Sequence, residues 1–253
     1  AKNIVRDVNT VASIFPFEAK AYEAAGAKVT FVGHPLIDTV HTSMSYEEAC
    51  IYFNVNKEAK RILLMPGSRK NEVMNLLPVM LQACNLLIKN VNCQIFIPRA
   101  ETISKSMLEE IIQKNGNLPV TITERNQYDL MSICTACVAS SGTATLETAL
   151  MELPTVLVYK LSPITWFLAK HLVHIKYAGL PNIILNKEVT PELLQSAVTP
   201  KNIKEIIEPW ITDSSIRNKN VIELRRVREK LGNSGAVQRV VELILNVAEK
   251  RNV

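Results

Sequence analysis

Residues 136–147 read Ala-Cys-Val-Ala-Ser-Ser-Gly-Thr-Ala-Thr-Leu-Glu: an apolar run, a small hydroxyl-rich turn and the start of a helical stretch. An apolar run of this length, bounded by serines and a glycine, indicates a buried strand that leads into a helix. The same order recurs on both sides of it, because short apolar runs alternate with amphipathic stretches. The runs are Thr10–Phe15, Val29–Val32, Arg61–Met65, Gln94–Pro98, Val120–Thr123, Ala136–Ser140 and Thr155–Tyr159.

The stretches between these runs have the spacing of helices. Between Met65 and Gln94, apolar residues recur every three or four positions and would form one apolar helix face. Helices that separate strands at this distance imply parallel β-α-β units, so the expected fold class is α/β. After Pro200 the pattern is helical: 203–208 ending before Pro209, then 216–231, then a helix capped by Ser234.

Composition sets limits on the class of protein. The 253 residues are 47% hydrophobic, an ordinary value for a globular protein, and no apolar run approaches the roughly 20 residues that span a bilayer. The five cysteines are odd in number and indicate reduced thiols in the cytoplasm. Cys134 and Cys137 form a C-x-x-C without a second ligand pair, which favours burial over zinc binding. The net charge of +5 does not decide between an anionic substrate, a membrane surface and nucleic acid.

Ligands of open parallel sheets bind beyond the carboxyl ends of the strands, so the residues that follow the apolar runs are candidates for a site. Pro66-Gly67-Ser68-Arg69 follows the run that ends at Met65. Glycine lets the backbone approach a ligand, the Ser68 hydroxyl can donate a hydrogen bond, and the Arg69 guanidinium suits phosphate. The alternative is a plain turn with an exposed arginine.

The second candidate is the turn after Ser140. Backbone N–H groups at the helix start would form a diphosphate cradle, and a carboxylate one turn in would accept hydrogen bonds from a ribose diol. No Gly-Lys-Ser/Thr follows, so this is not a Walker loop. The alternative for the carboxylate is stabilisation of the helix start. The residues concerned are Ser141, Gly142, Thr143, Ala144, Thr145 and Glu147.

The third candidate is the stretch Gly179-Leu180-Pro181-Asn182, with Gln195 further on. The side-chain amides of Asn182 and Gln195 can pair with sugar hydroxyls or phosphate oxygens. From composition alone, however, a loop and a helix cap are favoured.

Five segments of the chain form an ordered set of motifs: Phe15–Glu18, Val29–Leu36, Leu64–Arg69, Ser141–Glu147, and Leu180–Asn182 followed by Leu193–Gln195. They occur in the same order in lipid-A-disaccharide synthases, a family of inverting glycosyltransferases with the two-domain GT-B architecture. The chain resembles this family over nearly its whole length. The resemblance implies a Rossmann-like parallel sheet with flanking helices, the C-terminal half of a GT-B fold, followed by C-terminal helices. The family's acceptor-domain start, with its catalytic carboxylate, has no counterpart before Ala1.

The resemblance also implies a division of the chain and a role for each candidate. Residues 1–40 would end a truncated acceptor-side domain, 41–205 would bind the UDP-sugar, and 206–253 would pack across domains or in a homodimer. Arg69 and Asn182 would be catalytic, and the base would lie in the missing N-terminal region. The implied contacts are Ser68 and Arg69 to the departing UDP, Ser141, Gly142, Thr143, Ala144 and Thr145 to the diphosphate, Glu147 to the ribose, Asn182 and Gln195 to the donor sugar or phosphate, and Gly33 and His34 to the cleft between domains.

The family joins UDP-2,3-diacylglucosamine to 2,3-diacylglucosamine 1-phosphate and releases UDP, and no metal or other cofactor is expected. Acylated substrates imply a cytoplasmic enzyme that is peripheral on the inner membrane. Residues 160–176 mix apolar and basic side chains, as an interfacial helix does, although an ordinary packed helix is the alternative.

Two other functions are alternatives that the sequence leaves open. One is another GT-B enzyme of UDP-N-acetylglucosamine, either a peptidoglycan glycosyltransferase or a 2-epimerase. The other is a non-catalytic module that binds a nucleotide such as a UDP-sugar or that lies at a lipid interface. Nucleic acid is not an expected partner, because the basic residues are scattered and no groove-reading motif is present.

Overall fold

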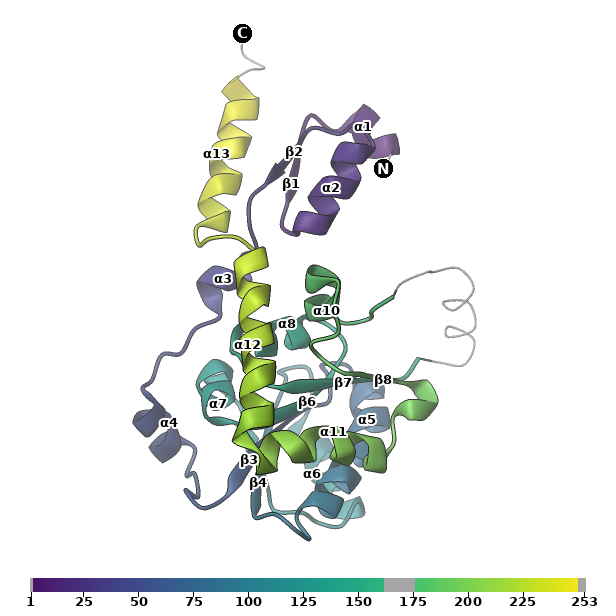
Figure 1. Cartoon of the computed structure of the whole chain (residues 1–253), viewed down its shortest axis with the longest axis vertical. Coiled ribbons are helices and arrows are strands. Elements are labelled where there is room, and N and C mark those ends of the chain that lie inside the picture. Colours follow the sequence, from purple (N-terminus) through teal and green to yellow (C-terminus); the bar gives the residue numbers. More distant parts are fainter. Residues whose placement is uncertain (1, 162–175, 250–253) are drawn as a thin grey trace.

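The structure is a computed structural model, and it describes residues 2–161 and 176–249. Within these residues the centre is a parallel sheet of six strands in the order β5-β4-β3-β6-β7-β8 (Figure 1). From β3 the chain builds one half of the sheet outward, returns to the centre at β6, and then builds the other half. The predicted α/β class is confirmed. The strands are β3 (Lys60–Met65), β4 (Cys93–Pro98), β5 (Val120–Thr123), β6 (Ala136–Ser140), β7 (Thr155–Tyr159) and β8 (Glu192–Leu194).

Helices cover both faces of this sheet. The helices that follow the strands or lie beside them are α4 (Tyr46–Tyr52), α5 (Lys70–Leu87), α6 (Lys105–Lys114), α7 (Gln127–Ile133), α8 (Thr143–Leu150), α10 (Leu180–Leu185) and α11 (Pro200–Thr212). Ile62 and Leu64 of β3 pack in one core with α5, α6 and α11, whereas Leu63 packs in the other core with α4 and α7. Side chains alternate between the two faces of a strand, so a run such as 62–65 is apolar throughout only when both faces are buried.

Residues 2–31 form a small unit outside the six-stranded sheet. Its elements are α1 (Lys2–Asp7), β1 (Val11–Ser13), α2 (Pro16–Ala24) and β2 (Val29–Phe31). β1 and β2 pair in parallel as a separate two-stranded sheet, against which α2 packs. A linker with α3 (Leu36–Thr39) and α4 then leads to β3 (Figure 1). The predicted domain boundary after residue 40 stays a prediction.

Pro209 was expected to end a helix, and this expectation was wrong. α11 continues through Pro209 to Thr212. A proline inside a helix removes one backbone hydrogen bond, but Trp210 and Ile211 beyond it are buried in the same core as Ile203. Burial of these two large side chains offsets the lost bond.

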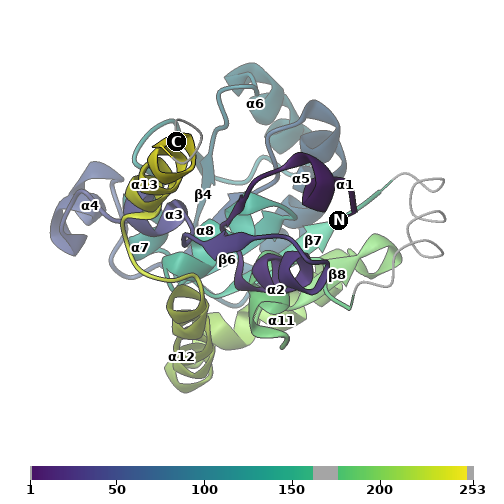
Figure 2. The same ribbon diagram turned by 90° about the horizontal axis from the view of Figure 1, so that it is seen from above.

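The last two helices are α12 (Ser214–Lys230) and α13 (Ala236–Glu249), joined by a turn (Figure 2). Ser234 was predicted to cap α13, but a residue far away in the sequence does so. The Asp38 carboxylate accepts hydrogen bonds from the N–H groups of Gly235 (2.8 Å) and Ala236 (3.3 Å). A carboxylate satisfies these donors and matches the positive end of the helix dipole, which a serine hydroxyl does less well.

Candidate functional site

A cavity of about 370 Å³ lies where the strand order reverses, between the carboxyl ends of β3 and β6. Such a reversal opens a crevice, because the loops after the two central strands run to opposite faces of the sheet. The cavity is lined by segments 65–69 and 140–144, the end of β4 at 98–100, and the side chains of Glu72, Gln127 and Glu147. Two of the three predicted positions therefore meet in one place. We call this cavity the central pocket.

The turn from β3 to α5 forms one wall of the central pocket. Gly67 has φ +114°, which favours glycine, and a Cβ there would collide with the Glu72 side chain. Arg69 is the residue before the first turn of α5, and its guanidinium donates a 2.8 Å hydrogen bond to Glu72 Oε1. That bond raises the pKa of Arg69. The Arg69 side chain is 79% exposed, so its cationic head stays accessible to a ligand.

The start of α8 forms the opposite wall. Gly142 has φ +139°, and no atom lies within 4 Å of where its Cβ would be, so the backbone conformation alone accounts for this glycine. The first N–H groups of a helix lack partners within that helix, and Thr143 and Ala144, the first two residues of α8, line the pocket wall. Thr145 does not face the pocket, contrary to expectation. It is fully buried, and its hydroxyl donates to the Gly142 carbonyl at 2.8 Å.

Glu147 lines the pocket one turn into α8, and a tyrosine fixes its carboxylate. The Tyr128 hydroxyl donates a 2.8 Å hydrogen bond to Glu147 Oε1. Burial, followed by this hydrogen bond, raises the pKa of Tyr128 to about 12, so the hydroxyl keeps its proton at neutral pH. Sequence reasoning missed Tyr128, Gln127 and Glu72. The first two begin the helix just after the β5 run, at the sheet edge where ligands bind, and this position was the available signal.

Arg99 also lines the central pocket and directly follows β4. Its guanidinium is engaged within the chain, with hydrogen bonds to Glu124 Oε1 (3.0 Å) and the Ile103 carbonyl (2.8 Å). It therefore holds the loop between β4 and α6 in place. The Thr102 hydroxyl of the same loop bonds the Ser68 carbonyl, which ties this loop to the turn that carries Arg69.

A second cavity, of about 650 Å³, adjoins the first and shares Arg69 and Glu72 with it. Gln195 lies here, beyond the end of β8, together with Lys70 and Lys160. We call this cavity the lateral pocket. The structure thus places Gln195 near Arg69 but outside the lining of the central pocket.

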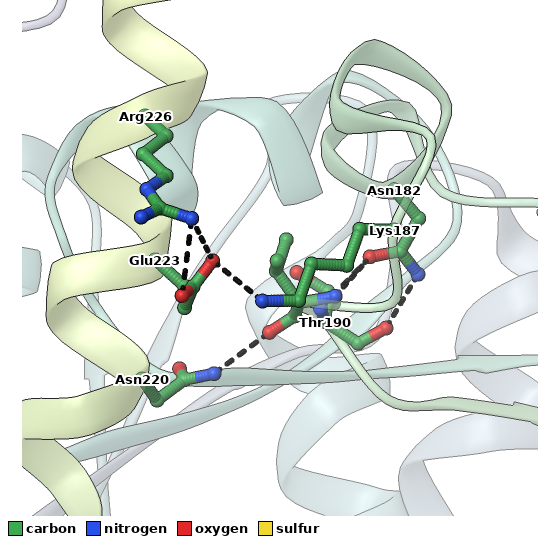
Figure 3. A network of polar contacts seen from close by, with 7 residues as sticks. Asn182, Lys187, Thr190, Asn220, Glu223 and Arg226 are labelled. Atoms are coloured by element: carbon green, nitrogen blue, oxygen red, sulfur yellow. Dashed lines mark hydrogen bonds and ion pairs between the residues drawn. The ribbon is translucent and has the colours of Figure 1, made fainter.

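Asn182 is not brought to either pocket, and its amide is used inside the fold (Figure 3). The side chain is fully buried. Its Nδ2 donates to the Thr190 carbonyl and to Glu192 Oε1, both at 2.7 Å. Its Oδ1 accepts from the N–H groups of Val189 (2.7 Å) and Thr190 (2.9 Å). Because every hydrogen-bonding position of this amide is occupied, it organises the chain between α10 and β8 and has none to offer a ligand.

Gly33 and His34 lie where the N-terminal unit meets the turn before α13. The backbone N–H of His34 donates a 3.1 Å hydrogen bond to the Leu231 carbonyl, and the His34 ring packs against the ring of Phe15. Burial lowers the pKa of His34. A Cβ on Gly33 would lie 2.9 Å from Arg239 Nη2. Neither residue lines the two pockets, so this junction is a packing contact in the structure.

The structure shows where the two cysteines of the C-x-x-C sequence lie. Cys137 is fully buried and Cys134 half-buried, both are free thiols, and burial raises the pKa of each. Among residues 2–161 and 176–249, no cluster of three or more His, Cys, Asp or Glu side chains is placed to hold a metal ion.

The same described residues include no helix that is both long and apolar enough to cross a bilayer. Most of the predicted interfacial segment, 162–175, lies outside the described residues.

Comparison with known proteins gives relatives in sequence and in fold. A family model described as lipid-A-disaccharide synthetase matches residues 1–243. Lipid-A-disaccharide synthase of Trichlorobacter lovleyi is 39% identical over 250 residues, which are 98% of this chain and 65% of the relative. That of Geobacter metallireducens is 38% identical over 251 residues, covering 99% and 65%. The chain thus spans just under two thirds of these relatives.

Solved structures share the fold at low sequence identity. A co-structure of S. aureus MnaA with UDP has a TM-score of 0.65 at 13% identity, covering 95% of this chain and 60% of that one. The glycosyltransferase WaaG, of lipopolysaccharide biosynthesis, has a TM-score of 0.57 at 11% identity, covering 93% and 62%. These likenesses confirm the GT-B type of fold. The match of the family model over 243 residues, together with identities near 39% to the curated relatives, shows that this chain belongs to the lipid-A-disaccharide synthase family.

Proposed function

We propose that this chain is the UDP-sugar-binding part of a lipid-A-disaccharide synthase. The reaction joins UDP-2,3-diacylglucosamine to 2,3-diacylglucosamine 1-phosphate and yields the β-1,6-linked disaccharide 1-phosphate and UDP. The central pocket carries this proposal, because it combines a helix start, an accessible arginine and a carboxylate at the point where open α/β sheets bind nucleotides. MnaA, which shares this fold, has been solved together with UDP, and this supports nucleotide binding as a use of the fold.

In this reaction the acceptor hydroxyl oxygen bonds to the anomeric carbon of the donor while the bond from that carbon to the UDP oxygen breaks. The bonding electrons leave with UDP, and the hydroxyl proton goes to a base. Negative charge therefore grows on the diphosphate in the transition state. The Arg69 guanidinium, the Ser68 hydroxyl and the N–H groups of Thr143 and Ala144 would stabilise this charge more than they stabilise the bound substrate, which accelerates the step.

The remaining residues of the central pocket would orient the nucleotide. Glu147 would accept a hydrogen bond from a ribose hydroxyl through the carboxylate oxygen that Tyr128 leaves open. Ser141 and Gly142 would let the diphosphate approach the start of α8. Asn182 enters the proposal as a positioning residue only, because its amide is bonded inside the chain between α10 and β8. The acceptor's base is expected outside the residues that line this pocket.

Calorimetric titration of the 253-residue chain with UDP and with ADP tests the proposal. We expect UDP to bind more tightly than ADP and Arg69→Ala to weaken UDP binding about tenfold, since one charge-assisted hydrogen bond to phosphate is lost at an exposed site. Arg226→Ala is the matched control, because Arg226 also pairs with a glutamate three positions away on a helix, at 3.1 Å, but lies on α12.

The control variant should bind UDP like the parent chain. If a folded parent chain binds neither nucleotide, or if Arg69→Ala binds UDP as tightly as Arg226→Ala does, the assignment of the central pocket is wrong. UDP binding without transfer of a sugar, once both substrates are supplied, would mark the chain as a binding module.

We further propose that the enzyme works at the cytoplasmic face of the inner membrane, because both substrates carry acyl chains. The net charge of +5 is compatible with an anionic lipid surface, although it does not select one by itself. Cosedimentation with vesicles containing anionic lipid, compared with neutral vesicles, tests this. A homodimer through residues 206–253 is proposed on the exposed apolar side chains of α13, such as Val237 and Ile244, and sedimentation velocity tests it.

A further inference from the structure

The central pocket extends past the groups that would hold the diphosphate and the ribose. The proposed diphosphate contacts lie after β3 and at the start of α8, which follows β6, and Glu147 lies one turn into α8. The pocket continues on the other side of β3, where residues 98–100 at the end of β4 line it together with Gln127. β4 is two strands away from β6, a distance of roughly 10 Å. A nucleoside spans a comparable length, so a nucleotide whose diphosphate lies at α8 would place its base at the end of β4.

The proposed ribose contact leads to the same end of the pocket. Glu147 is bonded at 2.8 Å by Tyr128, and Tyr128 directly follows Gln127 in the first turn of α7. α7 in turn follows β5, which pairs with β4. The wall that continues from the ribose contact is therefore the one that meets the ends of β4 and β5.

Arg99 lines the pocket at this end, and hydrogen bonds fix the plane of its guanidinium. Its Nε donates to Glu124 Oε1 at 3.0 Å, its Nη2 lies 3.0 Å from the same oxygen, and its Nη1 donates to the Ile103 carbonyl at 2.8 Å. The backbone N–H of Arg99 is bonded as well, to the Thr123 carbonyl at 2.7 Å. The N–H groups of a guanidinium point outward within its plane, so contacts at all three nitrogens hold that plane in one orientation. What such a side chain offers to a ligand is a flat face.

The surroundings of Arg99 suit a ring better than a phosphate. Its charge is balanced by Glu124, and its side chain is 21% exposed, whereas the side chain of Arg69 is 79% exposed and can turn to an anion. The neighbouring Pro98 and Ala100 bring apolar side chains to the same wall. A planar, weakly hydrated cation beside apolar atoms is a surface on which a nucleobase stacks.

We infer that one face of the Arg99 guanidinium stacks on the uracil ring of the nucleotide, while Glu124 and the Ile103 carbonyl hold the plane of the guanidinium. This inference rests on the proposed function, and it adds the contact that holds the base. Stacking on a cation requires a flat ring with delocalised electrons, and it does not depend on the hydrogen-bonding groups at the edge of the ring. The contribution of Arg99 to affinity should therefore disappear when the uracil ring is saturated.

The test uses 5,6-dihydro-UDP, which keeps both carbonyls and the N3–H of the uracil ring but has a puckered ring without delocalised electrons. Calorimetric titration of the 253-residue chain compares it with UDP and with ribose 5-diphosphate, which has no base. We expect UDP to bind about three- to tenfold more tightly than 5,6-dihydro-UDP. Arg99→Lys keeps a positive charge beside Glu124 but has no plane, so its affinity for UDP should fall by about the same factor. Its affinities for 5,6-dihydro-UDP and ribose 5-diphosphate should change less than about twofold, because neither ligand stacks.

Arg225→Lys is the matched control, because Arg225 also pairs with a glutamate, Glu152, at 2.8 Å, but lies on α12 outside the central pocket. It should bind all three ligands like the parent, and thermal unfolding of each variant checks that the chain stays folded. The inference is overturned if the parent binds UDP and 5,6-dihydro-UDP equally, if Arg99→Lys binds UDP like the parent, or if Arg99→Lys loses affinity for all three ligands equally. In each of these cases UDP binding by the parent leaves the proposed function standing. A folded parent chain that binds no UDP contradicts the proposed function and this inference together.

Discussion

Asn182→Ala separates the structural role of this amide from the ligand contact that the family resemblance implied. In the folded chain the amide makes four hydrogen bonds of 2.7–2.9 Å to Thr190, Glu192 and Val189, and the side chain is fully buried. Truncation at Cβ removes both donors and the acceptor. Three backbone groups, the N–H groups of Val189 and Thr190 and the Thr190 carbonyl, then lose a partner away from bulk water.

Each buried backbone group that loses its partner costs about 1–3 kcal/mol. Some of this is recovered if water enters the space that the amide leaves, so we expect the free energy of unfolding to fall by about 3–5 kcal/mol. That is a large share of the roughly 5–15 kcal/mol that stabilises a typical domain. The neighbouring contacts of Figure 3, Lys187 with Glu223 at 2.9 Å and the Asn220 amide with the Val189 carbonyl at 2.7 Å, depend on the same segment and should loosen with it.

Urea unfolding followed by circular dichroism measures the loss, and Asn246→Ala is the control because Asn246 is exposed on α13. The control should change the free energy of unfolding by less than about 0.5 kcal/mol. Asn182→Asp adds a second test. It keeps both acceptor contacts but places a carboxylate against Glu192, so it should be destabilised at pH 7 and should regain stability as the pH falls and one carboxyl takes up a proton.

A loss below about 1 kcal/mol for Asn182→Ala would refute this reasoning, since it is less than the cost of one unsatisfied buried group. A variant of parental stability that no longer binds UDP would mean that the amide contacts the ligand, as the family resemblance implied.

Three further predictions follow from the same structure. Tyr128→Phe should weaken UDP binding by about three- to tenfold, because the Glu147 carboxylate loses the hydrogen bond that orients it. In the same calorimetric titration, the variant's affinity for 2′-deoxy-UDP should fall less than its affinity for UDP. Equal losses for the two ligands would contradict a ribose contact. Gly67→Ala should destabilise the chain to urea by about 1–3 kcal/mol and weaken UDP binding, whereas Gly26→Ala, which is strained but has open space, should affect stability alone. Asp129→Ala should lower the free energy of unfolding by about 2–4 kcal/mol at pH 7, since two backbone N–H groups lose their acceptor. Burial raises the pKa of the Asp129 carboxyl, but its hydrogen bonds outweigh burial, so the pKa in the folded chain is lowered overall. The stability that this carboxylate contributes is therefore present above the pKa of Asp in the unfolded chain, near 3.9, and is lost as the pH falls through the lower pKa of the folded chain. A stability difference between variant and parent that persists unchanged in acid would contradict this.

The sequence was sufficient for the local elements and for most of the central pocket. The run at 136–140 and the turn after it predict a strand that leads into a helix, because strand burial and glycine conformations are local properties. The order of strands follows less directly, but a parallel sheet places every strand end at one edge. Ser68, Arg69, Gly142 and Glu147 therefore meet without further information.

Other features depend on residues distant in sequence, which no local pattern reveals. Asp38 caps a helix 197 residues away. Thr145 is a different case, because its hydroxyl bonds the Gly142 carbonyl only three residues away, although Thr145 stands in a run of candidate ligands. The local sequence around Asn182 is the same whether the side-chain amide contacts a ligand or buried backbone groups, so the sequence cannot distinguish the two roles.

What the sequence by itself determined is the α/β class, the family and the two turns that wall the central pocket, because these follow from apolar periodicity and from short motifs. What only the tertiary structure decided is which polar groups remain available to a ligand. Tyr128 acquires a role because it reaches Glu147, and Asn182 gives up its expected role because Thr190 and Glu192 occupy its amide. Hydrogen-bonding capacity is finite, and only the folded chain shows where it has been used.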